Sequence, residues 1–247
     1  MIPLKSEADL CCLRKSGKIL AKVMEKLETS ICPDITTIEL DRLAEELIKE
    51  NKALSAFKGY KGFPGNICVS LNEEIVHGIP GSRKIREGDI VSIDLGINYN
   101  GYFTDAAITL GVGEISQKTK QLIAVAKNSL SEGIKKARID NHLSDISCAI
   151  QSYVEAKGLS VVRQFVGHGI GKDLHEEPEI PNFGMSKQGP LLKKGMVLAI
   201  EPMVNMGTWE AIILDNGWTA VTKDRLPSAH FEHTIAITDS GPEILTK

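Results

Sequence analysis

Four carboxylates stand at repeated positions beside apolar segments of the chain. Asp94 follows the run Ile-Val-Ser-Ile and Glu201 follows the run Val-Leu-Ala-Ile, whereas Asp105 and Glu232 each begin a further strand-like stretch. Burying an unpaired carboxylate costs several kcal/mol, so a single such acid usually lies at a turn or pairs with a Lys or Arg. Two repeated pairs of acids fit that explanation poorly and point to a shared ligand.

A hairpin brings the first two acids together. Asn100-Gly101 favours a two-residue turn, and the resulting register places Asp105 opposite Gly96. Asp94 is then a diagonal neighbour of Asp105 on the same face, about 7 to 8 Å away along the backbone. Like charges this close require a cation between them, and a divalent metal is the natural candidate.

The repeat extends this prediction to the second half of the chain. Glu201 and Glu232 should supply a matching pair of carboxylates, and His168, in Val-Gly-His-Gly-Ile-Gly, should add an imidazole. Four carboxylates carry a charge of -4, which two divalent ions would neutralise. Such a set is typical of a dinuclear hydrolase and suits Mn, Fe(II), Co or Zn.

The other histidines differ in context. His77, in His-Gly-Ile, is the repeat partner of His168 and is expected to contact substrate, while His175 follows His168 by seven residues in a loop. His142 begins a helix and is expected to cap it or to be solvated. His230 and His233 flank the fourth acid and are expected to point away from it along a strand.

The elements that position these residues recur in order. Amphipathic spacing and capping patterns predict helices at 6–33, 36–51, 118–137 and 143–157. Strands are predicted at 67–71, 89–95, 102–110, 161–166, 196–204 and 230–238, with a hairpin of 209–214 and 218–222. Three short sequences repeat with the elements, so residues 1–247 are expected to form one domain of two related halves, about 1–112 and 113–247, across a pseudo-two-fold axis.

Composition excludes several classes of protein. The 247 residues are 42% hydrophobic with a net charge of -3, which excludes a disordered chain and a basic nucleic-acid footprint. No apolar run is long enough to span a membrane and no signal peptide is evident. Five cysteines, of which Cys11 and Cys12 are adjacent and the other three stand singly, include no C-x-x-C pair and favour reduced thiols in a cytoplasmic protein.

Together these motifs resemble those of a known family, the type I methionine aminopeptidases. The resemblance covers essentially the whole chain, including Val76-His-Gly-Ile-Pro, Gly167-His-Gly-Ile-Gly, His175-Glu-Glu-Pro and Phe231-Glu-His-Thr. It implies the pita-bread fold, an α/β (α+β) architecture in which two pseudo-symmetric halves form an antiparallel sheet covered by helices. It also implies five metal ligands, all present in this sequence: Asp94, Asp105, His168, Glu201 and Glu232.

The resemblance further implies an activity and residue roles. The activity is removal of the initiator Met from nascent chains with a small second residue, using two divalent ions. Glu201 would move the proton, His77 would bind the scissile amide, and His175 would steady the carbonyl oxygen. The Met pocket would be lined by Tyr60, Phe63, Cys68 and Trp218. A cytoplasmic monomer with transient ribosome association is expected.

Three residues depart from the family pattern. Leu174 stands where a Phe is common, Gly96 where many members carry Thr, and His230 where a Gln is common.

Two other functions are compatible with parts of the pattern. A proline-specific aminopeptidase or dipeptidase shares the fold and ligands but usually carries a large N-terminal domain. A catalytically inactive pita-bread binding protein would typically have lost ligands. The complete ligand set favours an active enzyme. The 33-residue spacing from His168 to Glu201 leaves no room for the helical insertion of the type II methionine enzymes, so type I is favoured.

Overall fold

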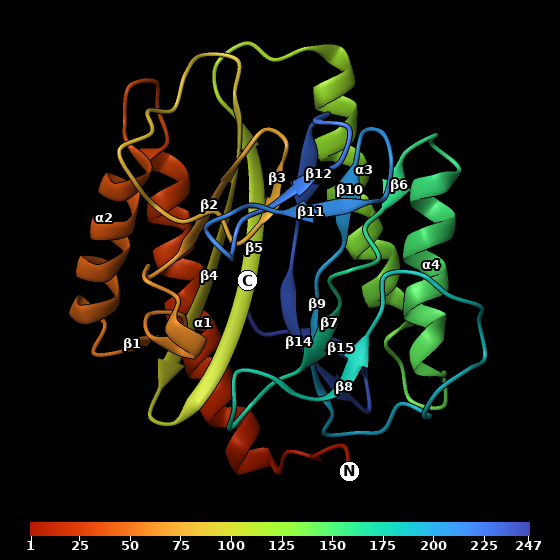
Figure 1. Cartoon of the computed structure of the whole chain (residues 1–247). Helices are drawn as coiled ribbons and strands as arrows, with labels where there is room; N and C mark the ends of the chain where they lie inside the picture. Colours follow the sequence, from red (N-terminus) through yellow and green to blue (C-terminus); the bar gives the residue numbers. More distant parts are fainter.

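Two pairs of helices flank a set of antiparallel strands (Figure 1). The computed structural model describes residues 1 to 247. One helix pair comes from each half of the chain, as the repeat predicts. The helices are α1 (Glu7–Ser30), α2 (Thr37–Glu50), α3 (Gln117–Lys136) and α4 (Leu143–Glu155), and a short 3-10 turn, η1, spans Tyr60–Gly62.

The strands divide into four sheets, and the two largest carry the candidate site. The first half provides β1 (Leu54–Ser55), β2 (Cys68–Leu71), β3 (Glu74–Val76), β4 (Ile90–Tyr99) and β5 (Tyr102–Gly111). The second half provides β6 (Ser160–Val161), β7 (Gly167–Gly169), β8 (Glu176–Ile180), β9 (Val197–Ile200), β10 (Met203–Asn205), β11 (Ala211–Ile213), β12 (Ala220–Thr222), β13 (Ser228–His230), β14 (His233–Thr238) and β15 (Gly241–Ile244). β5 and β4 with β1 and β2 form one large sheet, and β15-β14-β9-β7-β8 form the other.

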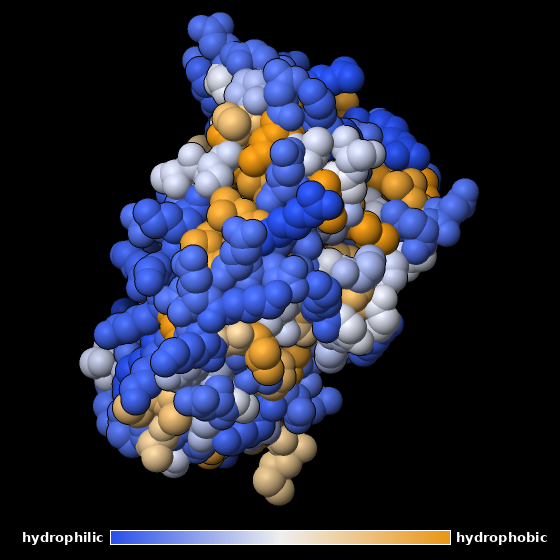
Figure 2. Space-filling view, turned by 90° about the vertical axis from the view of Figure 1, so that its left-hand side faces the viewer, coloured by the Kyte–Doolittle hydropathy of each residue, from blue (hydrophilic) through white to orange (hydrophobic).

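Capping and amphipathicity explain the helices. Ser6 and Thr36 are the N-caps of α1 and α2, and both form the capping boxes that the sequence predicts. α1 packs on β4 and β5, while α3 and α4 cover strands of the second half. The outward side of the α2 half is mostly hydrophilic, with scattered apolar patches (Figure 2), which is the expected solvent face of amphipathic helices. None of the helices has the length and apolarity needed to cross a membrane.

The hairpin register is confirmed. β4 and β5 pair with Gly96 opposite Asp105 and with Asp94 opposite Ala107. Asn100 and Gly101 both have positive φ, 53° and 79°, as a two-residue hairpin turn of the predicted kind requires. The turn therefore fixes which face of the hairpin carries the two acids.

Two predicted strands are wrong as continuous elements. The predicted strand 196–204 is interrupted at Glu201 and Pro202, and the predicted strand 230–238 is interrupted at Phe231 and Glu232. Pro202 has no N–H for the ladder, and the N–H of Glu232 instead donates to Ala107 O, 2.9 Å away on β5. Both interruptions place an acid at the junction of the halves. The predicted strand 161–166 is also too long, because β6 ends at Val161.

Two threonine hydroxyls hold the halves together on either side of the site. Thr234 Oγ1 accepts from the N–H of Asp105 at 2.9 Å and donates to its carbonyl at 2.8 Å. Thr109 Oγ1 makes the same pair of bonds, both 2.8 Å, with the backbone of His230. Each half thus fixes the backbone next to a site residue of the other half.

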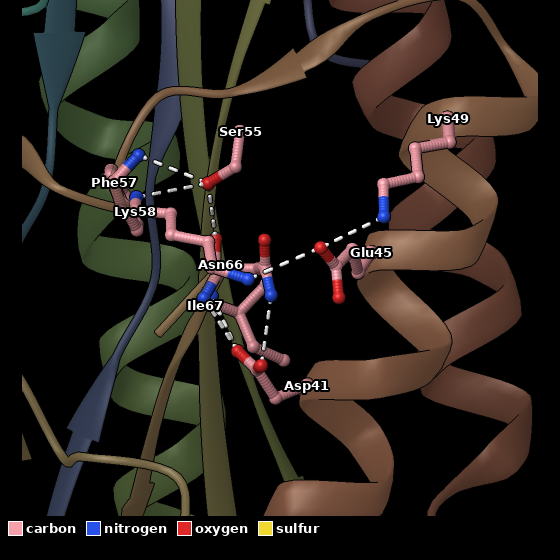
Figure 3. Close-up of polar contacts among 8 residues, drawn as sticks. All are labelled: Asp41, Glu45, Lys49, Ser55, Phe57, Lys58, Asn66 and Ile67. Atoms are coloured by element: carbon pink, nitrogen blue, oxygen red, sulfur yellow. Dashed lines mark hydrogen bonds and ion pairs between the residues drawn. The ribbon is translucent and has the colours of Figure 1, made fainter. Parts of the chain in front are cut away.

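A buried carboxylate on α2 anchors the loop that leads to the candidate pocket (Figure 3). Asp41, 6% exposed, accepts from the N–H of Asn66 at 2.6 Å, from its side-chain amide at 2.9 Å, and from the N–H of Ile67 at 3.2 Å. Ser55 Oγ ties the same loop by donating to Asn66 O. The loop between these ties carries Tyr60 and is therefore held at its base.

We expect Asp41→Ala to lower the free energy of unfolding by about 3 kcal/mol, because it leaves buried N–H donors without an acceptor. Urea unfolding would measure the change. Glu45→Ala, one helical turn away, is the matched control: Glu45 pairs with Lys49 and Lys58, both at the surface, so its loss should be about 0.5 kcal/mol. Equal losses in the two variants would contradict the anchoring role of Asp41.

Candidate metal centre and substrate pocket

One cavity of about 270 Å³ collects all the site residues predicted from the sequence. The predicted residues that line it are Tyr60, Phe63, Cys68, His77, Asp94, Asp105, His168, His175, Glu201, Trp218 and Glu232. Phe57, Lys61 and Leu174 complete the lining. Phe57 and Lys61 were not among the predicted site residues, although the neighbouring Tyr60 and the glycines at 59 and 62 mark this loop as a tight turn.

The acids and one imidazole converge at the floor of the cavity. One ligand atom each from Asp105, His168 and Glu232 lies within 4.8 Å of the other two. An oxygen of each of Asp94, Asp105 and Glu232 is buried without any hydrogen-bond partner. Buried polar atoms are rarely left unpaired, so these oxygens require a ligand from outside the chain.

Burial and crowding of the acids also change their pKa values. Burial raises the pKa of Asp105, Glu201 and Glu232 well above their ordinary values, and the charges of neighbouring acids raise these pKa values further. Burial also raises the pKa of Asp94, to about 7. Anionic oxygens forced together in a dry site fit divalent cations, which would favour the ionised forms.

His168 is prepared to act as a neutral ligand. Burial lowers its pKa to about 4, and its Nδ1 is hydrogen-bonded to Gly169 O at 2.9 Å. The other ring nitrogen, Nε2, faces Glu201 Oε1 at 3.5 Å. A backbone carbonyl that holds Nδ1–H leaves the Nε2 lone pair free for a metal.

The glycines beside His168 serve strand packing. A Cβ at Gly167 would lie 2.4 Å from Ala199 O, and one at Gly169 would lie 2.1 Å from Glu177 O. Only glycine therefore lets β7 fit between β8 and β9. Close packing against both neighbouring strands explains the glycines at 167 and 169.

His77 and His175 lie on the cavity wall. His77 follows β3 with φ at 59°, and its ring meets Phe165 and Trp218 edge to face. His175 Nδ1 and the Tyr60 hydroxyl are hydrogen-bonded at 2.8 Å, and the two rings stack. Burial, and then the nearby His168, lower the pKa of His175 to about 3, so its imidazole is neutral near pH 7.

The rest of the wall is apolar. Phe63 meets Trp218 edge to face at 5.1 Å between ring centroids. The buried Cys68 on β2 lies opposite Asp94 on β4 in the backbone register. Leu174, 2% exposed, packs in the same cluster and forms part of the pocket wall. The cluster forms an apolar wall facing the polar floor.

A steric contact explains why residue 96 is a glycine. A Cβ built there would lie 2.6 Å from the Phe57 ring, so a Thr could not replace this glycine without moving Phe57. Phe57 in turn lines the cavity. Thus Gly96, a departure from the family pattern, makes room for a pocket residue that was not predicted from the sequence.

His230 lies beside Glu201, a contact that the sequence did not predict. Its Nε2 lies 4.0 Å from Glu201 Oε2, on a side chain that is 2% exposed. The two-residue alternation of a strand does not apply, because the chain leaves β13 directly after His230. His233, by contrast, bonds Thr246 Oγ1 through Nδ1 at 2.9 Å and takes no part in the site.

Known proteins match this chain over its full length. The model of metallopeptidase family M24 matches residues 11–239. Methionine aminopeptidase of Clostridium perfringens is 54% identical over 100% of this chain and 99% of its own, and methionine aminopeptidase 1 of Bacillus subtilis is 53% identical with complete coverage of both. The crystal structure of methionine aminopeptidase from Thermotoga maritima superposes with a TM-score of 0.98 at 45% identity, again covering both chains completely.

These matches confirm the predicted pita-bread fold class, since the family is known for it and the superposition spans the whole chain. They do not favour a proline-specific enzyme or an inactive binding protein, because the relatives that match at this identity are methionine aminopeptidases. Membership in this family also implies the use of divalent metal, which agrees with the orphaned oxygens of the cavity. The chain belongs to the methionine aminopeptidases of metallopeptidase family M24.

Proposed function

We propose that this protein removes the N-terminal Met from polypeptides whose second residue is small. The observation that carries the proposal is the joining, in one cavity, of an acid cluster with unpaired oxygens and an apolar wall. The first could hold metal for hydrolysis, and the second could hold a single apolar side chain. The methionine aminopeptidases that match the chain support this combination.

Five residues would hold two divalent ions of Co, Mn, Fe(II) or Zn: Asp94, Asp105, His168, Glu201 and Glu232. When bound, such ions act as Lewis acids toward the scissile carbonyl and make water a stronger nucleophile at neutral pH. Hard carboxylate oxygens with one imidazole suit any of these metals. The raised pKa values of the acids in the metal-free protein are consistent with a site built for added positive charge.

The chain's own groups would move the protons. Glu201, which lines the cavity, would accept a proton from the attacking water and deliver it to the departing amine. We assign His175 the tautomer in which Nδ1 accepts from the Tyr60 hydroxyl and Nε2 carries the proton. His175 would then stabilise the developing negative charge on the carbonyl oxygen. His77, which also lines the cavity, would bind the scissile amide.

The apolar wall would select the first residue. Tyr60, Phe63, Cys68 and Trp218 would surround the Met side chain. The preference for a small second residue is proposed from the methionine aminopeptidases that the chain resembles.

The direct test is peptide hydrolysis by the metal-free protein reconstituted with Mn, Co or Fe(II). Release of Met from a Met-Gly peptide, with at least about 100-fold lower kcat/KM for a Met-Leu peptide, is the expected result. No release with any of the three metals would exclude the aminopeptidase. Equal cleavage of both peptides would exclude the selection for a small second residue.

We expect Tyr60→Phe to lower kcat about tenfold while KM stays within about threefold, because it removes the hydroxyl that sets the tautomer of His175 but keeps the pocket wall. Steady-state kinetics on a Met-Gly peptide would measure the effect. Phe63→Leu is the complementary variant: it alters the wall without touching His175, so KM should rise more than kcat falls. The reverse pattern in the two variants would contradict these assignments.

The biological setting belongs to the same proposal. We infer a cytoplasmic monomer that meets nascent chains with transient ribosome association. The five cysteines are all free thiols in the structure, which supports a reducing compartment. Sedimentation of the purified protein, alone and with ribosomes, would test the oligomeric state and the association separately.

A further inference from the structure

An unpaired imidazole lies directly behind the acid cluster. His230 Nε2 is buried and has no hydrogen-bond partner, although 98% of this side chain is removed from solvent. Leaving such a group unsatisfied costs about 1 to 3 kcal/mol, so its retention calls for an explanation. His230 does not line the cavity, so the explanation is not direct contact with substrate.

Its nearest partner is the second oxygen of Glu201. Glu201 Oε1 faces His168 at 3.5 Å, whereas Oε2 faces His230 Nε2 at 4.0 Å. The carboxylate thus lies between two imidazoles, one of which is a proposed metal ligand. A small side-chain adjustment would bring Nε2 within hydrogen-bonding distance of Oε2.

The backbone of His230 is already fixed for this contact. Its N–H and C=O are both bonded to Thr109 Oγ1, which is itself bonded to Ser92 at 2.8 Å. On its other side, β13 pairs His230 with Met203 of β10. Few degrees of freedom therefore remain besides rotation of the ring, so little conformational entropy is lost when the bond forms.

We propose that His230 is a positioning residue, whose Nε2–H donates a hydrogen bond to Glu201 Oε2 and holds that carboxylate in its working orientation. The inference rests on the proposed function of Glu201. A carboxylate fixed from behind presents its other oxygen toward the cavity without a search among rotamers. Partners of this kind typically change metal affinity or activity by 10- to 100-fold when removed.

Three substitutions at His230 distinguish the loss of its hydrogen-bond donor from the loss of its ring. His230→Leu removes the donor and keeps an apolar side chain, His230→Gln supplies an amide N–H at similar reach, and His230→Asn supplies an amide that is too short. His233→Leu is the matched control, because His233 is a half-buried histidine beside Glu232 but bonds Thr246 instead. Mn²⁺ binding by calorimetry and kinetics on a Met-Gly peptide are measured for each.

The expected result is a 10- to 100-fold fall in kcat for His230→Leu and His230→Asn, with KM within about threefold and Mn²⁺ affinity about tenfold weaker. His230→Gln should restore both quantities to within about threefold of the wild type, and His233→Leu should not move them. Wild-type values in His230→Leu would overturn the proposal. So would loss of a whole metal equivalent that Gln does not restore, since that result would make His230 a ligand.

Failure of the proposed function and failure of the His230 contact would give different results. If the wild-type protein binds Mn²⁺ but releases no Met, the proposed function is wrong, while calorimetry of the variants still tests the His230 contact. If the wild type is active and His230→Gln falls as far as His230→Leu, only the positioning role is wrong. His230→Asn keeps the test open if the Leu variant does not fold.

Discussion

Glu201→Gln is expected to lower kcat at least about 1,000-fold while the protein stays folded. The amide keeps the size of the side chain but cannot accept a proton from water, and general base catalysis by a placed side chain is worth about 100- to 10,000-fold. Glu201 is also a proposed metal ligand, so a weaker metal complex would add to the loss. Kinetics on a Met-Gly peptide and circular dichroism together measure the two parts of the prediction.

Glu179→Gln is the matched control for this substitution. Glu179 is exposed on β8 and its backbone pairs with that of His168, so the same chemical change is made beside the site without entering the cavity. We expect activity within twofold of the wild type. A Glu201→Gln variant with near-normal kcat would remove the proton-transfer role of Glu201.

Asp105→Asn is expected to have opposite effects on activity and on the stability of the metal-free protein. The substitution removes an anionic oxygen from the group that includes His168 and Glu232, so metal affinity should fall at least about 100-fold and hydrolysis should be lost. The metal-free variant should nevertheless unfold at a higher temperature than the metal-free wild type at pH 8. The gain arises because one fewer buried carboxylate has to ionise beside its neighbours.

The pH dependence fixes the sign of this stability effect. Burial raises the folded-state pKa of these acids above the unfolded value, so their contribution to stability is complete below the unfolded pKa and is lost as the pH rises through the folded pKa. For Asp94 that interval runs from 3.8 to about 7. The free energy of unfolding of the metal-free wild type should therefore fall across this range, and less so in Asp105→Asn.

Thermal unfolding with and without Mn²⁺ at pH 5 and pH 8 would measure both effects. The wild type should gain stability from Mn²⁺, chiefly at pH 8, and the variant should gain little. Asp89→Asn provides a control, because Asp89 caps a turn away from the cavity through Arg86 N–H. A metal-free Asp105→Asn protein less stable than the wild type at pH 8 would contradict the account of buried charge.

The sequence was sufficient wherever the controlling interactions are local. Capping boxes at Ser6 and Thr36 and the Asn100-Gly101 turn depend on residues within a few positions of one another, and the structure confirms all three. The turn also fixes the register of β4 and β5, which is why the shared face of Asp94 and Asp105 could be predicted. The internal repeat then identified the corresponding acids of the second half.

Tertiary structure alone decided the features that depend on contacts between the halves. The strand interruptions at Glu201 and Glu232 arise partly from a bond to Ala107 across the junction, which no periodicity in either segment encodes. Phe57 reaches the cavity because Gly96, distant in sequence, leaves it space. His230 turns toward Glu201 because its backbone is fixed by Thr109 of the other half. Residue types and local spacing thus specified the chemistry, whereas long-range packing decided which side chains stand around it.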